Sequence, residues 1–247
     1  MNHNGRIAVV TGGASGIGKA IAKNLCNDGF SVAICYNNSE AQANALVSEF
    51  FSQGCRAIAV KADTADSQEV NQMINTVCRQ LGTPSVVINN AGIAQQKLFT
   101  DITDDDWNRM IGVNLTGTFN VCRAVLPYMI HEKKGKIINI SSMWGQTGAS
   151  CEVHYSAAKA GVIGLTKALA KEVAPSGITV NCIAPGAVAT KMMSSFSEED
   201  ISALCEEIPM ERIAAPEEIA AVVSFLASDK ASYITGQIIG VNGGMVI

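Results

Sequence analysis

Short apolar segments alternate with longer amphipathic segments from one end of the chain to the other. Several of the short segments are rich in β-branched residues and lack a polar face, which is typical of strands in a parallel sheet covered on both sides. The predicted strands cover residues 6–11, 31–36, 56–61, 85–89, 136–141, 178–183 and 237–241.

Between these strands, apolar residues recur with the spacing of one helical face. Helix starts are marked by Asp66 or Ser67, and by Thr103 with Asp106 three residues later, because such side chains cap the free N–H groups of a first turn. The predicted helices cover residues 18–27, 40–53, 67–80, 107–129, 155–173 and 216–227.

The strand–helix alternation predicts right-handed crossovers and an α/β fold, a Rossmann-type, three-layer, doubly wound sandwich with a seven-stranded parallel sheet. We find no linker, repeat or low-complexity tract, so residues 1–247 are expected to form a single domain. The pattern breaks in segment 186–215, which is interpreted either as a lid over a substrate or as a pair of surface helices.

The charge balance argues against several classes of function. With 18 Lys and Arg against 22 Asp and Glu, the net charge is −4, whereas a general nucleic-acid binder needs clustered basic residues. No segment approaches the roughly 20 apolar residues of a membrane span, and the first residues do not resemble a secretion signal. The eight cysteines include no C-x-x-C pair, so we expect no metal site and a reducing, cytoplasmic location.

The first predicted strand leads into the glycine-rich sequence TGGASGIG at residues 11–18 and then into a helix. Glycines let the backbone turn tightly and approach a pyrophosphate, while the helix N-terminus offers free N–H groups and a positive dipole. This placement between strand and helix predicts a dinucleotide site. Its candidate contacts are Gly12, Ser15, Gly16, Ile17 and Gly18.

The end of the second strand bears on the identity of the dinucleotide. An acidic residue there would bind the adenosine ribose hydroxyls and repel a 2′-phosphate. This chain instead has Asn37, Asn38 and Ser39, with no carboxylate until Glu40. The missing carboxylate favours NADP(H). NAD(H) stays the alternative, because no Arg or Lys is present there to bind a 2′-phosphate and because Asn37, Asn38 and Ser39 are also interpreted as plain turn residues.

Small and polar residues also follow the third and fourth strands, namely Asp63 with Thr64, and Asn90 with Ala91 and Gly92. Open α/β sheets bind ligands at the carboxyl ends of their parallel strands. Asp63 is a candidate acceptor for the adenine amino group, and Asn90 is a candidate for fixing the turn beside the ribose. Each is also a common turn residue.

The candidate chemistry is carried by Tyr155 and Lys159, which lie four residues apart in a predicted helix and therefore share one face. A free tyrosine, with a pKa near ~10, is too weak an acid for proton transfer at neutral pH. A neighbouring cation is expected to lower that pKa. Ser142 precedes Tyr155 by thirteen residues and ends the fifth predicted strand.

Together, these features resemble the short-chain dehydrogenase/reductase family over essentially the whole chain. The resemblance implies a dinucleotide-binding and catalytic domain, a nicotinamide cofactor, and hydride transfer at a carbonyl or secondary alcohol. The matching pieces are the glycine-rich turn, the sequence NNAG at 89–92, Asn114, Ser141 with Ser142, Tyr155 with Lys159, and Pro185 with Gly186.

The same resemblance implies catalytic roles for four residues. Tyr155 would protonate the developing alkoxide during reduction, and Lys159 would bind the nicotinamide ribose and lower the tyrosine pKa. Ser142 would hydrogen-bond the substrate oxygen, and Asn114 would anchor a water that links Lys159 to solvent. Two preorganised donors are suited to this reaction because hydride addition places negative charge on the oxygen.

Beyond these four, the resemblance implies that Val188 and Thr190, which follow Pro185 and Gly186, hold the nicotinamide carboxamide. His154 adjoins Tyr155 but is expected to face solvent, with contact to substrate as the alternative.

Within the family, the chain is most similar to bacterial 3-oxoacyl-(acyl-carrier-protein) reductases, in segments such as 113–117, 178–181 and 231–245. This similarity implies a role in fatty acid biosynthesis and a homotetramer with helices 107–129 and 155–173 and the C-terminal strand at its interfaces. Lys133 lies where a basic residue would dock the acidic carrier protein. Ser176, however, occupies a place where the best-known reductases carry arginine.

The segment 142–155 favours a second interpretation, because it resembles elongation factor P 5-aminopentanone reductases, which reduce a ketone on a modified lysine side chain that carries an amine. Trp144 would wall the pocket, and Glu152 would attract an ammonium group. A free small ketone or hydroxysteroid is a further alternative. A non-catalytic dinucleotide sensor is the alternative of another class, and the intact catalytic set opposes it.

Overall fold

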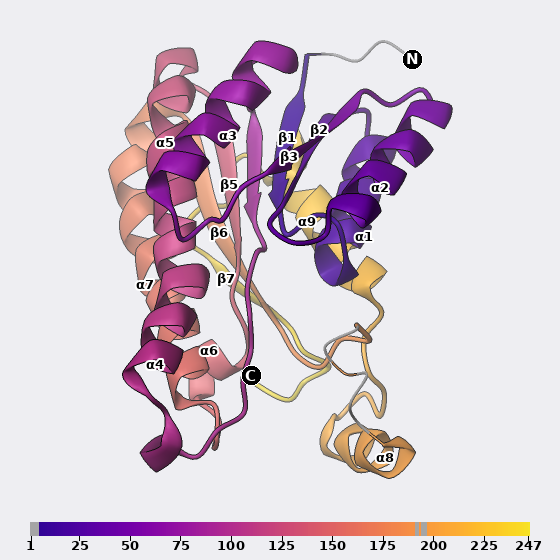
Figure 1. Ribbon diagram of the computed structural model, residues 1–247, viewed down its shortest axis with the longest axis vertical. Helices are drawn as coiled ribbons and strands as arrows, with labels where there is room; N and C mark the ends of the chain where they lie inside the picture. The colour runs from indigo at the N-terminus through magenta and orange to yellow at the C-terminus, as the bar shows by residue number, and fades with distance from the viewer. Residues whose placement is uncertain (1–4, 191–192, 194–196) are drawn as a thin grey trace.

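The seven strands predicted from the sequence form one sheet. The computed structural model describes residues 5–190, 193 and 197–247, and within them all neighbouring strands run parallel in the order β3-β2-β1-β4-β5-β6-β7 (Figure 1). The predicted α/β class and seven-stranded parallel sheet are therefore confirmed. The strands are β1 (Ile7–Thr11), β2 (Ser31–Tyr36), β3 (Ala57–Lys61), β4 (Val86–Asn89), β5 (Gly135–Ile140), β6 (Ile178–Pro185) and β7 (Ile238–Val241).

The α-helices connect these strands and lie on both faces of the sheet. In Figure 1, α3, α5 and α7 cover one face, and α1, α2 and α9 cover the other. The helices are α1 (Gly16–Asn27), α2 (Glu40–Ser52), α3 (Ser67–Gln80), α4 (Asp104–Ile111), α5 (Gly117–Glu132), α6 (Trp144–Thr147), α7 (Val153–Val173), α8 (Glu198–Glu207) and α9 (Pro216–Ala227).

Residues 107–129 are helical throughout, as predicted, but they belong to a longer and less regular helical segment. The structure has α4, a π-helical turn at Gly112–Thr116 and then α5. The predicted helix start at Thr103 with Asp106 is confirmed, and the helix therefore begins at Asp104 and not at residue 107. The Thr103 hydroxyl accepts from the Asp106 N–H while the Asp106 carboxylate accepts from the Thr103 N–H, which forms a capping box. By contrast, α3 and α9 begin and end where the sequence predicted.

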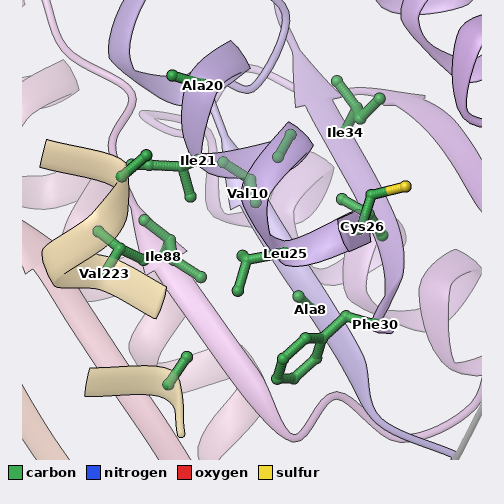
Figure 2. Close-up of a cluster of buried hydrophobic side chains, with 14 of the residues drawn as sticks. Ala8, Val10, Ala20, Ile21, Leu25, Cys26, Phe30, Ile34, Ile88 and Val223 are labelled. Atoms are coloured by element: carbon green, nitrogen blue, oxygen red, sulfur yellow. The ribbon is translucent and has the colours of Figure 1, made fainter. Parts of the chain in front are cut away.

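The hydrophobic core on the α1 side packs α1 and α9 against the sheet (Figure 2). Ile21 and Leu25 of α1 are fully buried against Val10 of β1, Ile88 of β4 and Val223 of α9. Burying an aliphatic side chain of this size contributes about 2 kcal/mol. The packing fixes the start of α1 against the carboxyl end of β1.

The carboxyl ends of the parallel strands share one edge of the sheet, and α4, α6 and α8 lie toward that edge, in the lower part of Figure 1. The strand order reverses between β1 and β4. Such a switch point leaves a crevice where open α/β sheets bind ligands.

None of the helices in the described part of the chain is long and apolar enough to cross a membrane.

Candidate active site

The ends of β1 and β4 are joined at the switch point by a compact set of hydrogen bonds. The Thr11 hydroxyl accepts from the backbone N–H groups of Asn90 and Ala91, each at 3.0 Å. The Asn90 amide nitrogen donates in return to the carbonyl oxygens of Thr11, at 3.0 Å, and Gly12, at 3.2 Å. Asn90 therefore fixes the first residues of the glycine-rich turn.

The turn itself requires glycine at several positions. Gly12 and Gly16 have φ of 62° and 50°, in the left-handed region where a Cβ is unfavourable. A Cβ at Gly18 would collide with the Gly12 carbonyl oxygen and lie 2.5 Å from the Asn90 amide nitrogen. Ser15, at the N-cap of α1, makes no capping side-chain hydrogen bond to the described residues. The first N–H groups of α1 are therefore available to an anion such as a pyrophosphate.

The residues after β2 provide polar groups without a carboxylate. Asn37 and Asn38 are exposed, and Ser39 is the N-cap of α2 with no side-chain capping bond to the part of the chain that the structure describes. Tyr36, the last residue of β2, is buried. The donors of this group and the N-terminus of α2 together suit a phosphate.

The two predicted residues after β3 differ in their surroundings. Asp63 is partly buried, and its carboxylate accepts from the Ala65 N–H at 2.9 Å while its own N–H donates to Glu69 at 2.8 Å. Thr64 is buried against Gly117, where a Cβ would lie 2.7 Å from the threonine hydroxyl. Asp63 is thus held at the edge of the site, whereas Thr64 packs under α5.

Asn114 lies in the π-helical turn between α4 and α5, and its side chain is fully buried. The amide nitrogen donates to the carbonyl oxygens of Ile93, at 3.0 Å, and Met110, at 3.1 Å, and the amide oxygen accepts from the Ile93 N–H at 3.3 Å. A Cβ at Gly92 would lie 2.7 Å from the Asn114 oxygen and 3.4 Å from the Lys159 nitrogen. Asn114 therefore holds the segment after β4 beside Lys159. π-Helical turns of this kind are frequent at functional sites.

Three of the predicted catalytic residues converge at the carboxyl end of β5. Ser142 is buried and accepts from the Trp144 N–H at 3.2 Å, and its side chain lies close enough to Tyr155 to act against the rise in the tyrosine pKa. The Lys159 ammonium donates to the Ile140 carbonyl oxygen at 3.0 Å and lies 5.7 Å from the centroid of the Tyr155 ring. The spacing of four residues along α7 therefore places the phenol and the ammonium side by side, as expected.

The pKa values of Tyr155 and Lys159 are both shifted by burial, and the shift of Tyr155 is opposite to the one predicted. Burial raises the pKa of Tyr155 to about 12, against the opposing effect of the Ser142 hydrogen bond and with a further increase from Glu152. Burial lowers the pKa of Lys159 to about 8. The expectation that Lys159 lowers the tyrosine pKa is not met in this structure, because the ammonium lies beside the ring and desolvation of the phenolate dominates.

The end of β6 and the residue after it contact both the loop that follows Ser142 and the last strand, β7. The Met143 N–H donates to the Pro185 carbonyl oxygen, and the Gly186 N–H donates to the Val241 carbonyl oxygen, each at 2.9 Å. A Cβ at Gly186 would lie 2.8 Å from the Cα of Asn242. Glycine is therefore required for this close approach.

Beyond Gly186, Val188 is buried and pairs with Ala214 in a short parallel bridge. Thr190 faces the glycine-rich turn, since a Cβ at Gly16 would lie 3.4 Å from its methyl group. Residues 191–192 and 194–196 of the predicted lid segment lie outside the described residues. The structure thus brings Thr190 to the same edge as the turn after β1.

His154 is a correction to the sequence analysis. The expectation that it faces solvent is wrong, because its side chain is fully buried and its Nε2 lies 3.0 Å from the Gln95 amide oxygen. The sequence did not identify Gln95 as part of the site. The Gln95 amide nitrogen donates to the Asp106 carboxylate at 3.0 Å, and Asp106 was predicted only as a helix cap. The sequence carries no periodic signal for these contacts, since they join residues that are 59 and 11 positions apart in different segments.

Glu152 lies beside the tyrosine at the start of α7. It is partly buried, accepts from the Gln96 amide nitrogen at 3.4 Å, and raises the pKa of Tyr155 through its negative charge. Burial raises the pKa of Glu152 itself. A carboxylate in this position disfavours the phenolate and would favour a cationic group placed nearby.

The described residues of this edge suit a dinucleotide. Positive-φ glycines, a turn that a Cβ would obstruct and the open N-terminus of α1 provide for a pyrophosphate. Asn90 and Lys159 extend the same edge toward Ser142 and Tyr155. Among the described residues, no three His, Cys, Asp or Glu side chains gather into a group that could hold a metal ion.

Comparison with known proteins gives matches over nearly the whole chain. A family model described as enoyl-(acyl carrier protein) reductase matches residues 12–246. The 3-oxoacyl-(acyl-carrier-protein) reductase of Staphylococcus epidermidis is 43% identical over 96% of this chain and 98% of its own. Proteins of the same description from a Synechocystis species and Thermotoga maritima are 44% and 39% identical, with coverage of 98% and 100% of this chain and 97% and 100% of their own.

Proposed function

The chain belongs to the short-chain dehydrogenase/reductase family, and from that membership we propose that it reduces the keto group of a 3-oxoacyl chain carried by acyl-carrier protein. It is an oxidoreductase similar over its full length to 3-oxoacyl-(acyl-carrier-protein) reductases, and its family uses a nicotinamide dinucleotide. The product would be the corresponding 3-hydroxyacyl chain, as in fatty acid biosynthesis.

The arrangement of donors supports ketone reduction over reduction of a carbon–carbon double bond. Ser142 lies close enough to Tyr155 to act on the pKa of the phenol, so a single substrate oxygen can lie within reach of both hydroxyls. Two donors on one oxygen stabilise an alkoxide as it forms. In the reduction of a carbon–carbon double bond, hydride adds to a carbon that bears no oxygen. Two donors that converge on an oxygen of the reacting carbon would then not be required.

In the proposed reaction, the reduced nicotinamide supplies the hydride when it is bound. Tyr155 enters the reaction protonated, with a pKa raised to about 12. It can still donate its proton to the substrate oxygen, because the alkoxide that forms there is a stronger base than the phenolate. Ser142 holds that oxygen by a hydrogen bond. Lys159 lies beside Tyr155 and is held by the Ile140 carbonyl, and it is proposed to bind the nicotinamide ribose hydroxyls.

We propose that the enzyme prefers NADP(H). Asn37, Asn38 and Ser39 offer donors after β2, and the first carboxylate is Glu40, inside α2. A 2′-phosphate would therefore meet the positive end of a helix dipole and no acidic residue from the strand end. Asp63, Asn90, Val188 and Thr190 are proposed to hold the adenine, ribose and carboxamide portions.

The observation that carries the proposal is the Ser142–Tyr155–Lys159 cluster at the end of β5 and the start of α7. The test is turnover of acetoacetyl-CoA with NADPH or NADH, followed by the loss of reduced nicotinamide absorbance, in the wild type and in Ser142→Ala. We expect oxidation of NADPH that depends on the ketone and falls about 100-fold or more in the variant. No turnover with any ketone in a panel of carbonyl compounds would contradict the proposal and favour a non-catalytic sensor.

A second candidate is the reduction of a ketone that carries an amine, as in elongation factor P 5-aminopentanone reductases. The observation in its favour is Glu152, a partly buried carboxylate that acts against ionisation of Tyr155. An ammonium group bound at Glu152 would neutralise that effect and gain an ion pair in a partly desolvated site.

The two candidates are separated by comparing 5-amino-2-pentanone with 2-pentanone, which differ only in the amine. The second candidate predicts that the amine raises kcat/KM by about 10-fold or more and that Glu152→Gln abolishes the difference. Equal kcat/KM for the two ketones, with faster turnover of acetoacetyl-CoA, would favour the 3-oxoacyl substrate.

We further propose a cytoplasmic homotetramer that uses the outer faces of α4, α5 and α7. Trp107 and Phe119 are 40% and 45% exposed on α4 and α5, which leaves aromatic surface available to a neighbouring subunit. Light scattering coupled to size exclusion tests the assembly, and a monomeric mass would contradict it. Lys133 is the proposed basic contact to the carrier protein.

A further inference from the structure

The residues just before Tyr155 are held against the segment that follows β4. Three consecutive residues of that segment each make one hydrogen bond to the start of α7 or to the two residues before it, and we refer to these three contacts as the clasp. They are Gln95 Oε1 to His154 Nε2 at 3.0 Å, Gln96 Nε2 to Glu152 Oε1 at 3.4 Å, and Lys97 N to Cys151 O at 2.8 Å.

His154 is the buried member of the clasp, with none of its surface exposed. The Gln95 amide nitrogen donates to the Asp106 carboxylate at 3.0 Å. Because a carboxylate only accepts, the amide nitrogen must face Asp106 and the amide oxygen must face His154. His154 Nε2 is therefore the donor of its hydrogen bond, which fixes the tautomer of the ring.

The far end of this chain of hydrogen bonds is firmly held. The Asp106 carboxylate accepts from the Lys97 ammonium at 2.6 Å and from the Thr103 hydroxyl at 2.7 Å. These contacts, the Lys97 hydrogen bond above all, keep the pKa of Asp106 well below its usual range. Asp106 is thus ionised at neutral pH, and it also caps α4. Gln95 therefore connects His154 to a rigid helix start.

Stability alone does not explain this arrangement. Glu152, the N-cap of α7, makes no side-chain capping bond to the described residues, and Cys151 has φ of 61°, which is strained for a residue with a Cβ. His154 Nδ1 is buried without a hydrogen-bond partner in the described part of the chain, which is also unfavourable. The start of α7 is held by the clasp in spite of these costs, which indicates a functional reason.

We propose that His154 is a positioning residue, which fixes the first turn of α7 so that the Tyr155 hydroxyl meets Ser142. The inference rests on the proposed function of Tyr155. Neighbouring residues of a helix differ by about 100° around its axis. Burial of the His154 ring and its bond to Gln95 therefore set the direction in which the Tyr155 side chain leaves the helix. Misplacement of a catalytic group by about 1 Å can reduce the rate about 100-fold.

The test compares His154→Ala with His154→Gln, whose amide nitrogen can still donate to Gln95. Kinetics use NADPH and the ketone identified by the carbonyl panel. We expect His154→Ala to lower kcat by about 10- to 100-fold, with KM and the dissociation constant of NADPH changed by less than about threefold. His154→Gln should recover most of kcat. The matched control is His131→Ala, at an exposed histidine at the end of α5, and it should match the wild type.

Gln95→Leu removes the partner of His154 while leaving the histidine in place, so it carries the test should His154→Ala fail to fold. It should show the same loss of kcat, and the double variant should be no worse than the more impaired single variant, because both act through one contact. Wild-type kcat in folded His154→Ala or Gln95→Leu would overturn the proposal. So would equal impairment of His154→Gln and His154→Ala, or a loss of NADPH affinity in step with kcat. Full activity of Tyr155→Phe would instead overturn the proposed function.

Discussion

Replacing Lys159 with methionine should make the protein more stable at neutral pH while it removes activity. Lys159 is 4% exposed, and its ammonium has one hydrogen-bond partner in the described structure, the Ile140 carbonyl oxygen. Its ordinary pKa of 10.5 is lowered to about 8 by burial. The charged form is therefore less favourable in the folded protein than in the unfolded chain, by about 3 kcal/mol at neutral pH.

Methionine has a similar length and no charge to bury, so Lys159→Met removes this cost. It also removes the hydrogen bond to Ile140, which is worth about 1 kcal/mol. The net gain is about 2 kcal/mol, which corresponds to a rise in Tm of roughly 4–8 °C for a domain of this size. Thermal unfolding followed by circular dichroism measures this difference directly.

The pH dependence gives the sharper test. Between about pH 8 and pH 10.5 the unfolded chain still binds the lysine proton and the folded protein does not, so wild-type stability gains from this group as pH rises. The difference in Tm between Lys159→Met and the wild type should therefore shrink between about pH 7 and pH 10. Lys230→Met, at an exposed lysine, is the control and should show no such pH-dependent difference. A less stable Lys159→Met at about pH 7, or a difference that does not change with pH, would refute the reasoning.

Three further variants test other parts of the site. Gly18→Ala should reduce both the affinity for NADPH and the free energy of unfolding, because its Cβ would collide with the Gly12 carbonyl. The free energy of unfolding should fall by about 1–3 kcal/mol, and an unchanged urea unfolding curve would contradict the close packing of Gly18 against Gly12. Asn37→Asp should weaken NADPH by about 10-fold and NADH by much less, as measured by nucleotide fluorescence, and equal weakening would place the 2′-phosphate elsewhere. Glu152→Gln should move the pH profile of alcohol oxidation to lower pH, since Glu152 raises the pKa of Tyr155, and a shift to higher pH would contradict that charge effect.

The sequence predicted the elements whose signals are local. The bounds of α3 follow from a capping aspartate and a regular apolar face. The convergence of Ser142 with Tyr155 was instead an implication of the family resemblance. The Asn90 contacts to Thr11 and Gly12 place its side chain at a turn, where a turn-fixing role was proposed for it from the sequence.

The features that the sequence did not predict depend on tertiary contacts. The π-helical turn within helix 107–129 accompanies the hydrogen bonds between Asn114 and Ile93, which join segments that a helical pattern treats as independent. The buried His154 side chain is hydrogen-bonded to Gln95, a residue from a distant segment that no local pattern connects with the start of α7. The raised pKa of Tyr155 follows from desolvation, whereas the spacing of Tyr155 and Lys159 indicated only the sign of their charge interaction.

The most direct test of the proposed chemistry is the rate of hydride transfer in a single turnover of Tyr155→Phe, with NADPH bound and the ketone saturating. Phenylalanine keeps the ring and removes the proton that Tyr155 is proposed to donate. The rate should fall by a factor of about 100 to 10,000, while NADPH binds as tightly as in the wild type. A rate within about threefold of the wild type would show that the Tyr155 hydroxyl is not the proton donor.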